Sequence, residues 1–194
     1  MYDASESERS PLMNGDSSYS RFISGDKDAF AELVIRYNKS LIFYLYGIVK
    51  NIDTAEDIAA DTFAEIFVKK PHLKTEDAFH AYLFKAGRNN ALDFLRKFLR
   101  KSRAEERLRA EYSAEGELEA ELIRDERKRA LHSALGELKD DYRDALHLIY
   151  FEEMSYEQAG KAMNKSVKQI TNLVYRAKES LRRILEERGI SYED

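Results

Sequence analysis

Residues 155–169 read SYEQAGKAMNKSVKQ and predict two short helices joined by a tight turn. Ser155 and Ser166 are each followed three residues later by glutamine, the pattern of a capping box at a helix start. Asn164 stands between the two helices, where a residue in the left-handed conformation would end the first one. Gly160 lies within the first helix, where a steep helix crossing requires little bulk. The stretch therefore predicts a helix-turn-helix.

The second helix of this pair is amphipathic and basic. In residues 165–188, seven lysines and arginines outnumber three glutamates, although the whole chain has a formal net charge of −4. A basic helix after a tight turn is typical of a protein that reads the major groove of DNA. A solvated face on a structural helix pair remains the alternative. The candidate DNA-contacting residues are Lys165, Ser166, Lys168, Gln169, Asn172 and Arg176.

The rest of the chain predicts an all-α protein of two small helical domains. Only two prolines occur in 194 residues, which leaves long stretches without a helix breaker. Cysteine is absent, which excludes a disulfide, a thiolate zinc site and a cysteine nucleophile. We expect a flexible tail over 1–24, a first domain over 25–100, a charged linker over 101–126, a second domain over 127–188 and a short tail over 189–194.

The first domain is expected to be a three-helix bundle. Apolar residues recur every three or four positions from Asp28 to Ile48, then up to Pro71, and again from Thr75 to Arg100. Asp53 or Thr54 is expected to cap the second helix. The side chains expected to point inward from the third helix are Phe79, Leu83, Ala86, Phe94 and Phe98.

The third helix also carries a polar stripe beside its apolar face. An aromatic ring interleaved with cations and an amide suits single-stranded nucleic acid, because bases stack on the ring while cations neutralise phosphates. A solvated face with one amphipathic tyrosine is the alternative. The stripe consists of Tyr82, Lys85, Asn89 and Arg96, with Arg88 and Lys97 adding positive charge nearby.

The second helix of the first domain is acidic. Asp57, Asp61 and Glu65 lie four residues apart, with Glu56 alongside, and like charges at this spacing repel one another. A basic partner surface would relieve the repulsion, so the helix is interpreted as a docking face. A magnesium-dependent nucleotide pyrophosphatase using Glu56, Asp57 and Asp61 is a remote alternative, since no second carboxylate helix is evident.

Three blocks of the sequence together resemble one family. Residues 55–63 (AEDIAADTF), 79–83 (FHAYL) with 88–97 (RNNALDFLRK), and SYEQ at 155–158 with YRAK at 175–178 are similar to regions two and four of extracytoplasmic-function (ECF) sigma factors. Two departures concern the DNA contacts. Tyr82 stands where the family usually has tryptophan, and Lys168-Gln169 replaces the common Gly-Thr.

The resemblance implies a non-enzymatic sigma factor without a cofactor, which guides RNA polymerase core to promoters and helps open the DNA. It implies contact between the core β′ coiled coil and the acidic helix, and between the β flap and the second domain. It also implies an anti-sigma factor. The implied core-binding residues are Asp53, Glu56, Asp57, Asp61 and Glu65. The implied minus-ten residues are Lys70, His72, Lys74, Tyr82, Lys85, Arg88, Asn89, Arg96 and Lys97, and the basic helix would read the minus-thirty-five element.

Two further expectations concern class and location. A helix-turn-helix regulator that binds duplex DNA without polymerase would explain the second domain, but not the stripe of the third helix. The N-terminal residues lack the basic lead and apolar core of a secretory signal, and no stretch is apolar enough to span a bilayer. We therefore expect a cytoplasmic protein.

Overall fold

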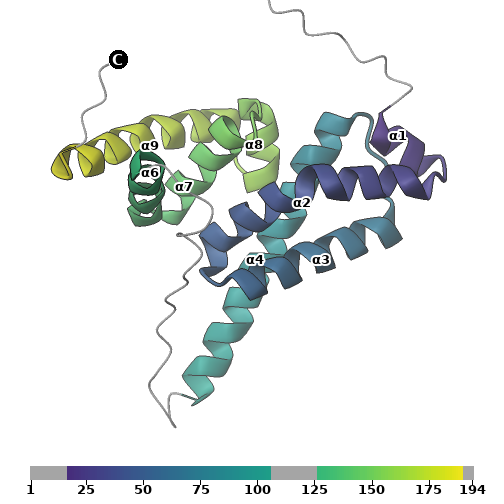
Figure 1. Cartoon of the computed structure of the whole chain (residues 1–194), viewed down its shortest axis with the longest axis horizontal. Helices are drawn as coiled ribbons and strands as arrows, with labels where there is room; N and C mark the ends of the chain where they lie inside the picture. Colours follow the sequence, from purple (N-terminus) through teal and green to yellow (C-terminus); the bar gives the residue numbers. More distant parts are fainter. Residues whose placement is uncertain (1–16, 106–125, 190–194) are drawn as a thin grey trace, which may run out of the picture.

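The computed structural model describes residues 17–105 and 126–189, and every regular element within these ranges is helical (Figure 1). This confirms the all-α prediction. The first bundle contains α1 (Ser18–Ile23), α2 (Lys27–Val49), α3 (Ile52–Lys69) and α4 (Glu76–Glu105). The second contains α6 (Glu126–Glu137), α7 (Asp140–Leu146), the π-helical turn η1 (His147–Phe151), α8 (Tyr156–Met163) and α9 (Val167–Glu187).

The apolar faces of α2, α3 and α4 meet in the core of the first bundle, as the spacing predicts. Leu33 and Leu45 of α2 and Phe79 of α4 are completely buried, and Ile66 of α3 is 1% exposed. The ring of Phe79 stacks on that of Tyr19, with centroids 4.7 Å apart. Aromatic packing therefore ties the short α1 to the three long helices.

The predicted N-terminal tail is wrong for Ser18–Ile23, which forms α1. The hydroxyl of Ser17 accepts a hydrogen bond from the Ser20 backbone N–H and caps the helix. Tyr19 and Phe22 are both 1% exposed, and the Tyr19 hydroxyl donates to the Pro71 carbonyl. Six residues are too few to show helical periodicity in the sequence. The aromatic residues Tyr19 and Phe22 were the indication that this segment packs against the core. Residues 1–16 lie outside the described part of the chain.

The connection between α2 and α3 is shorter than predicted. Lys50 adopts the left-handed conformation, with φ 57°, and ends α2. The side-chain oxygen of Asn51 then accepts from the Thr54 N–H at 2.8 Å, so Asn51 is the N-cap of α3 in place of Asp53 or Thr54. Asp53 instead lies in the first helical turn, where its negative charge interacts favourably with the positive end of the helix dipole.

The C-terminal part of α4 projects beyond the bundle (Figure 1). Phe94 and Phe98 are 38% and 44% exposed, so the prediction that they point into the core is wrong. Their rings stack on each other, with centroids 6.2 Å apart. The periodicity continues past the region where α2 and α3 cover the helix, and a periodic pattern alone does not show where the partner helices end.

The second bundle packs around α9. Leu148 of η1 and Ile170 of α9 are completely buried, and Val174 is 3% exposed. Leu135 of α6 and Leu138, which follows that helix, are also buried. The two bundles contact each other, with α4 against α8 and α2 against α7. Among the described helices, none has the length and apolar character needed to cross a membrane.

Candidate nucleic-acid interface

The helix-turn-helix has the predicted capping chemistry at both helix starts. The Ser155 hydroxyl accepts from the Gln158 N–H at 3.2 Å, and the Gln158 side chain accepts from the Ser155 N–H at 2.7 Å. Ser166 and Gln169 repeat the arrangement at 3.2 and 2.8 Å. Asn164 is left-handed, with φ 56° and ψ 46°, and ends α8. The sequence prediction of this motif is confirmed.

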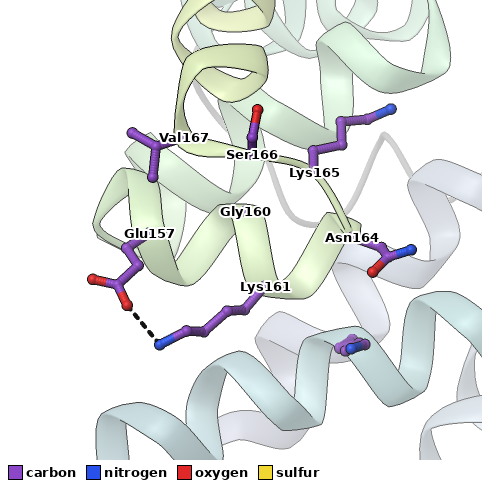
Figure 2. A pocket seen from close by; sticks show the side chains of 8 residues that line it. Glu157, Gly160, Lys161, Asn164, Lys165, Ser166 and Val167 are labelled. Atoms are coloured by element: carbon purple, nitrogen blue, oxygen red, sulfur yellow. Dashed lines mark ion pairs between the residues drawn. The ribbon is translucent and has the colours of Figure 1, made fainter.

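Gly160 allows the turn to fold back closely on α8. Figure 2 shows it beside the connection that carries Lys165 and Ser166. The Lys165 N–H donates to the Gly160 carbonyl at 2.8 Å. A Cβ atom at this position would lie 2.7 Å from the backbone oxygen of Lys165, well inside normal contact distance. The small residue is therefore required by the turn itself.

Replacing Gly160 with alanine should destabilise the second domain by about 1–3 kcal/mol, because the new Cβ forces the Lys165 carbonyl to move. Chemical denaturation of the full chain would measure the loss. Gly136→Ala is the matched control, since a Cβ at that helical position meets nothing within 4 Å and alanine favours helix. Equal stability of the two variants would contradict the steric argument.

The face of α9 that should read DNA points outward. Lys168, Gln169, Asn172 and Arg176 are exposed, whereas Ile170 on the opposite side is fully buried. Successive positions 168, 172 and 176 form one stripe along the helix. The other two predicted residues have structural partners. Lys165 forms an ion pair with Asp141 at 3.0 Å, and Ser166 is the N-cap.

The residues predicted to meet the minus-ten element differ in their exposure and in their partners. Tyr82 is partly buried, and Arg96 forms an ion pair with Asp93. Arg88 binds Asp144 of the second domain at 2.9 Å and Asp141 at 3.3 Å. Lys85 lines a surface pocket together with residues of the helix-turn-helix. The residues of this group that are exposed are Lys70, His72, Lys74, Asn89, Arg96 and Lys97.

The acidic face of α3 is exposed along most of its length. Asp53, Glu56, Asp57 and Asp61 are all exposed. Glu65 differs, because hydrogen bonds from Lys69 and Asn90 hold it and lower the pKa of its carboxyl. In residues 17–105 and 126–189, no group of three histidine, aspartate or glutamate side chains could hold a metal ion.

A polar cluster that no sequence pattern predicted lies between the two bundles, and we term it the Glu152 cluster (Glu152, Ser40, His80 and His147). One carboxylate oxygen of Glu152 lies 3.1 Å from the Ser40 hydroxyl and 3.1 Å from His80 Nε2. The other oxygen lies 3.2 Å from His147 Nε2. Burial acts to raise the pKa of Glu152, but the histidine hydrogen bonds outweigh it and lower the pKa to about 2.

Acidification should remove stability that the Glu152 carboxylate provides. Its pKa falls from an ordinary 4.5 to about 2, so the contribution is complete above pH 4.5 and is lost as the pH falls towards 2. Between about pH 5 and pH 3, we expect wild type to lose on the order of 2 kcal/mol more than Glu152→Gln. Urea unfolding of both proteins at pH 5 and pH 3 measures the free energies of unfolding. Equal losses in wild type and Glu152→Gln would contradict the lowered pKa of Glu152.

The exposed basic α9 and the two bundles define a class, namely an all-α DNA-binding protein with a helix-turn-helix domain. Comparison with known proteins gives the family. Residues 33–101 match the model described as Sigma-70 region 2, and residues 128–181 match Sigma-70, region 4. The chain belongs to the sigma-70 family and is a sigma factor of the ECF type.

Curated relatives span nearly the same length. The chain is 28% identical to the ECF RNA polymerase sigma factor SigW of Bacillus subtilis, over 83% of this chain and 91% of that protein. It is 27% identical to the RNA polymerase sigma-H factor of Pseudomonas aeruginosa, over 84% and 89%. Both domains are included in matches of this length.

Solved structures show the same fold. The sigma factor RpoE, in a co-crystal structure with the anti-sigma factor NepR from Bartonella quintana, superposes with a TM-score of 0.65 at 25% identity. That comparison covers 83% of this chain and 98% of RpoE. CnrH, solved with the cytosolic domain of CnrY, gives a TM-score of 0.62 at 24% identity, over 88% and 96%.

Proposed function

We propose that this ECF sigma factor directs RNA polymerase core to specific promoters and helps to open the DNA at the minus-ten element. The observation that carries the proposal is the separation of two exposed charged faces on one chain. The basic face of α9 suits duplex DNA, and the acidic face of α3 suits a basic protein. The mechanism uses binding energy and no bond chemistry.

In this mechanism, the second domain anchors the upstream duplex. Asn172 and Lys168 would contact base edges in the major groove, while Arg176 would neutralise a phosphate. Gln169 would approach DNA with its amide nitrogen, since its side-chain oxygen already caps Ser166. The docking of this domain on the β flap of the polymerase is part of the same proposal.

The first domain would bind both core and the separated minus-ten strand. The exposed carboxylates of α3 repel one another along the helix, and a basic surface such as the β′ coiled coil would relieve that repulsion. The ring of Tyr82 gains stacking only when a base leaves the duplex, so the domain stabilises the open state selectively. The basic residues of the α3–α4 connection, Lys70, His72 and Lys74, would line the path of the displaced base.

An anti-sigma factor is also proposed as a partner, with the cytoplasm as the site of action. The proposal is supported by RpoE, a relative in fold that was crystallised with its anti-sigma factor NepR. Such a partner would compete with core for the same sigma factor.

Co-elution with bacterial RNA polymerase core, followed by run-off transcription on a fragmented genomic library, tests the function. We expect a stable complex and discrete new transcripts whose upstream sequences share two elements. A variant with Asp57 and Asp61 both changed to lysine should lose core binding while remaining folded, because both side chains are exposed. A protein that ignores core but binds duplex DNA alone would be a regulator of another class.

Tyr82→Ala should slow promoter opening by roughly 5–150-fold, which corresponds to about 1–3 kcal/mol for one stacked base. Binding to closed duplex promoter should remain near the wild-type value. Stopped-flow fluorescence of a base analogue in the minus-ten element measures the opening rate. Tyr82→Phe is the control, because it keeps the ring and should open DNA normally. Normal opening by Tyr82→Ala would show that the ring does not stack on a base.

A further inference from the structure

At the boundary between the two domains of the described chain, residues of both domains form hydrogen bonds with one buried carboxylate. Glu152 belongs to the second domain, and its side chain is only 6% exposed. Ser40 of α2 and His80 of α4 reach its Oε2 oxygen from the first domain, each at 3.1 Å. His147 reaches Oε1 from within the second domain. The Glu152 cluster therefore joins three helical elements across the domain boundary.

A second polar contact across the same boundary uses a residue proposed to bind DNA. The Arg88 guanidinium donates to Asp144 at 2.9 Å, and the two side chains are 14% and 3% exposed. Lys85, one turn earlier on α4, faces the pocket formed with Gly160 and Lys165 of the helix-turn-helix. In this arrangement, the second domain covers part of the face that should meet the minus-ten strand.

The same boundary also contains features that weaken it. Arg143 Nε and Asp144 Oδ1 are buried and have no hydrogen-bond partner among the described residues, which costs free energy. The Arg143 Nε atom lies against Gly47 of α2, so this cost is incurred where the domains touch. Burial also raises the pKa of Asp144 in spite of Arg88. Opening the domains would return these groups to water.

We propose that the chain alone adopts a closed form in which the second domain covers Lys85 and Arg88, and that the Glu152 cluster holds this form shut. The inference rests on the proposed function, since it concerns access to the minus-ten face. Core and promoter DNA bind the open form, so the free energy of opening is subtracted from their binding. The weak polar packing at the boundary keeps that free energy small enough for core to overcome.

Förster transfer between dyes on the two domains tests the closed form without polymerase. The chain has no cysteine, so Ala60→Cys in α3 and Glu179→Cys in α9 introduce two exposed labelling sites, one in each domain. In this background, Glu152→Gln removes the charge that both histidines bind. Glu153→Gln is the matched control, because it makes the same change at the next residue, which is exposed.

We expect Glu152→Gln to raise the ratio of open to closed molecules by roughly tenfold or more, and Glu153→Gln to leave it unchanged. Ser40→Ala should raise it by a smaller factor, because it removes one donor from the first domain and leaves His147 in place. Circular dichroism and the thermal unfolding midpoint establish that each variant is folded. An unchanged transfer distribution in both Glu152→Gln and Ser40→Ala would overturn the proposal.

The rate of association with core distinguishes this proposal from the proposed function. If the cluster holds the closed form, Glu152→Gln should bind core faster than wild type and Glu153→Gln should not. If wild type and all variants bind core at one rate, the function stands and the closed form does not limit it. If none of them binds core, the proposed function fails, while the transfer measurement still decides whether the cluster closes the chain.

Discussion

Phe79→Ala should lower the free energy of unfolding of the first domain by about 3–5 kcal/mol. Phe79 is completely buried, and its ring contacts those of Tyr19 and Tyr37, with centroids 4.7 and 5.8 Å away. Alanine would leave a cavity where α1, α2 and α4 meet, and the backbone of a three-helix core can close it only in part. Urea unfolding followed by circular dichroism measures the change.

The control for this prediction is another phenylalanine of the same helix. Phe98 is 44% exposed, beyond the region that α2 and α3 cover. Phe98→Ala should therefore cost less than about 1 kcal/mol. If the two substitutions destabilised the protein equally, the core would have to extend along α4 as far as Phe98, which would contradict the described fold.

Asn172→Ala should reduce discrimination at one base pair of the upstream promoter element by about 1–3 kcal/mol, or roughly 5–150-fold. Asn172 is exposed in the stripe that it shares with Lys168 and Arg176. An asparagine amide can pair with two atoms of one adenine edge, and alanine offers neither donor nor acceptor. Competition binding of the core complex to promoters randomised at the upstream element measures the change in preference.

Lys178→Ala is the matched control on the same helix. The Lys178 ammonium lies 5.1 Å from the centroid of the Tyr150 ring, away from the stripe. Its loss removes one positive charge from α9, and any effect on affinity should be small and equal for all sequences. If Asn172→Ala instead weakened every sequence equally, the residue would be a backbone contact and not a reader of bases.

Features that depend on neighbouring residues in the chain could be predicted from the sequence. Ser155 with Gln158 and Ser166 with Gln169 mark helix starts because each pair lies within one turn. The left-handed Asn164 followed from the known tolerance of asparagine for that conformation. The apolar periodicity of α2, α3 and α9 was equally informative, since each helix buries one continuous face.

Features that depend on contacts between distant residues could not be predicted in this way. His80 and Glu152 are 72 positions apart, and neither stands in a recognisable motif. The hydrogen bond from Arg88 to Asp144 could not be predicted for the same reason, since the two residues are 56 positions apart. The proposed DNA-binding and core-binding residues remain predictions, although the exposure of Lys168, Asn172 and Asp61 is compatible with them.

The π-helical turn η1 has a consequence for how the closed form could evolve. His147–Phe151 completes its turn with more residues than an α-helix uses, and Glu153 follows it with φ 50°. A π-helical turn takes one more residue than an α-helical turn, so deleting one codon within η1 would restore α-helical spacing and leave Glu152 pointing in nearly the same direction. A lineage could thus gain or lose one residue at this turn while Glu152 still faced the first domain, because the π-helical turn absorbs the change in length.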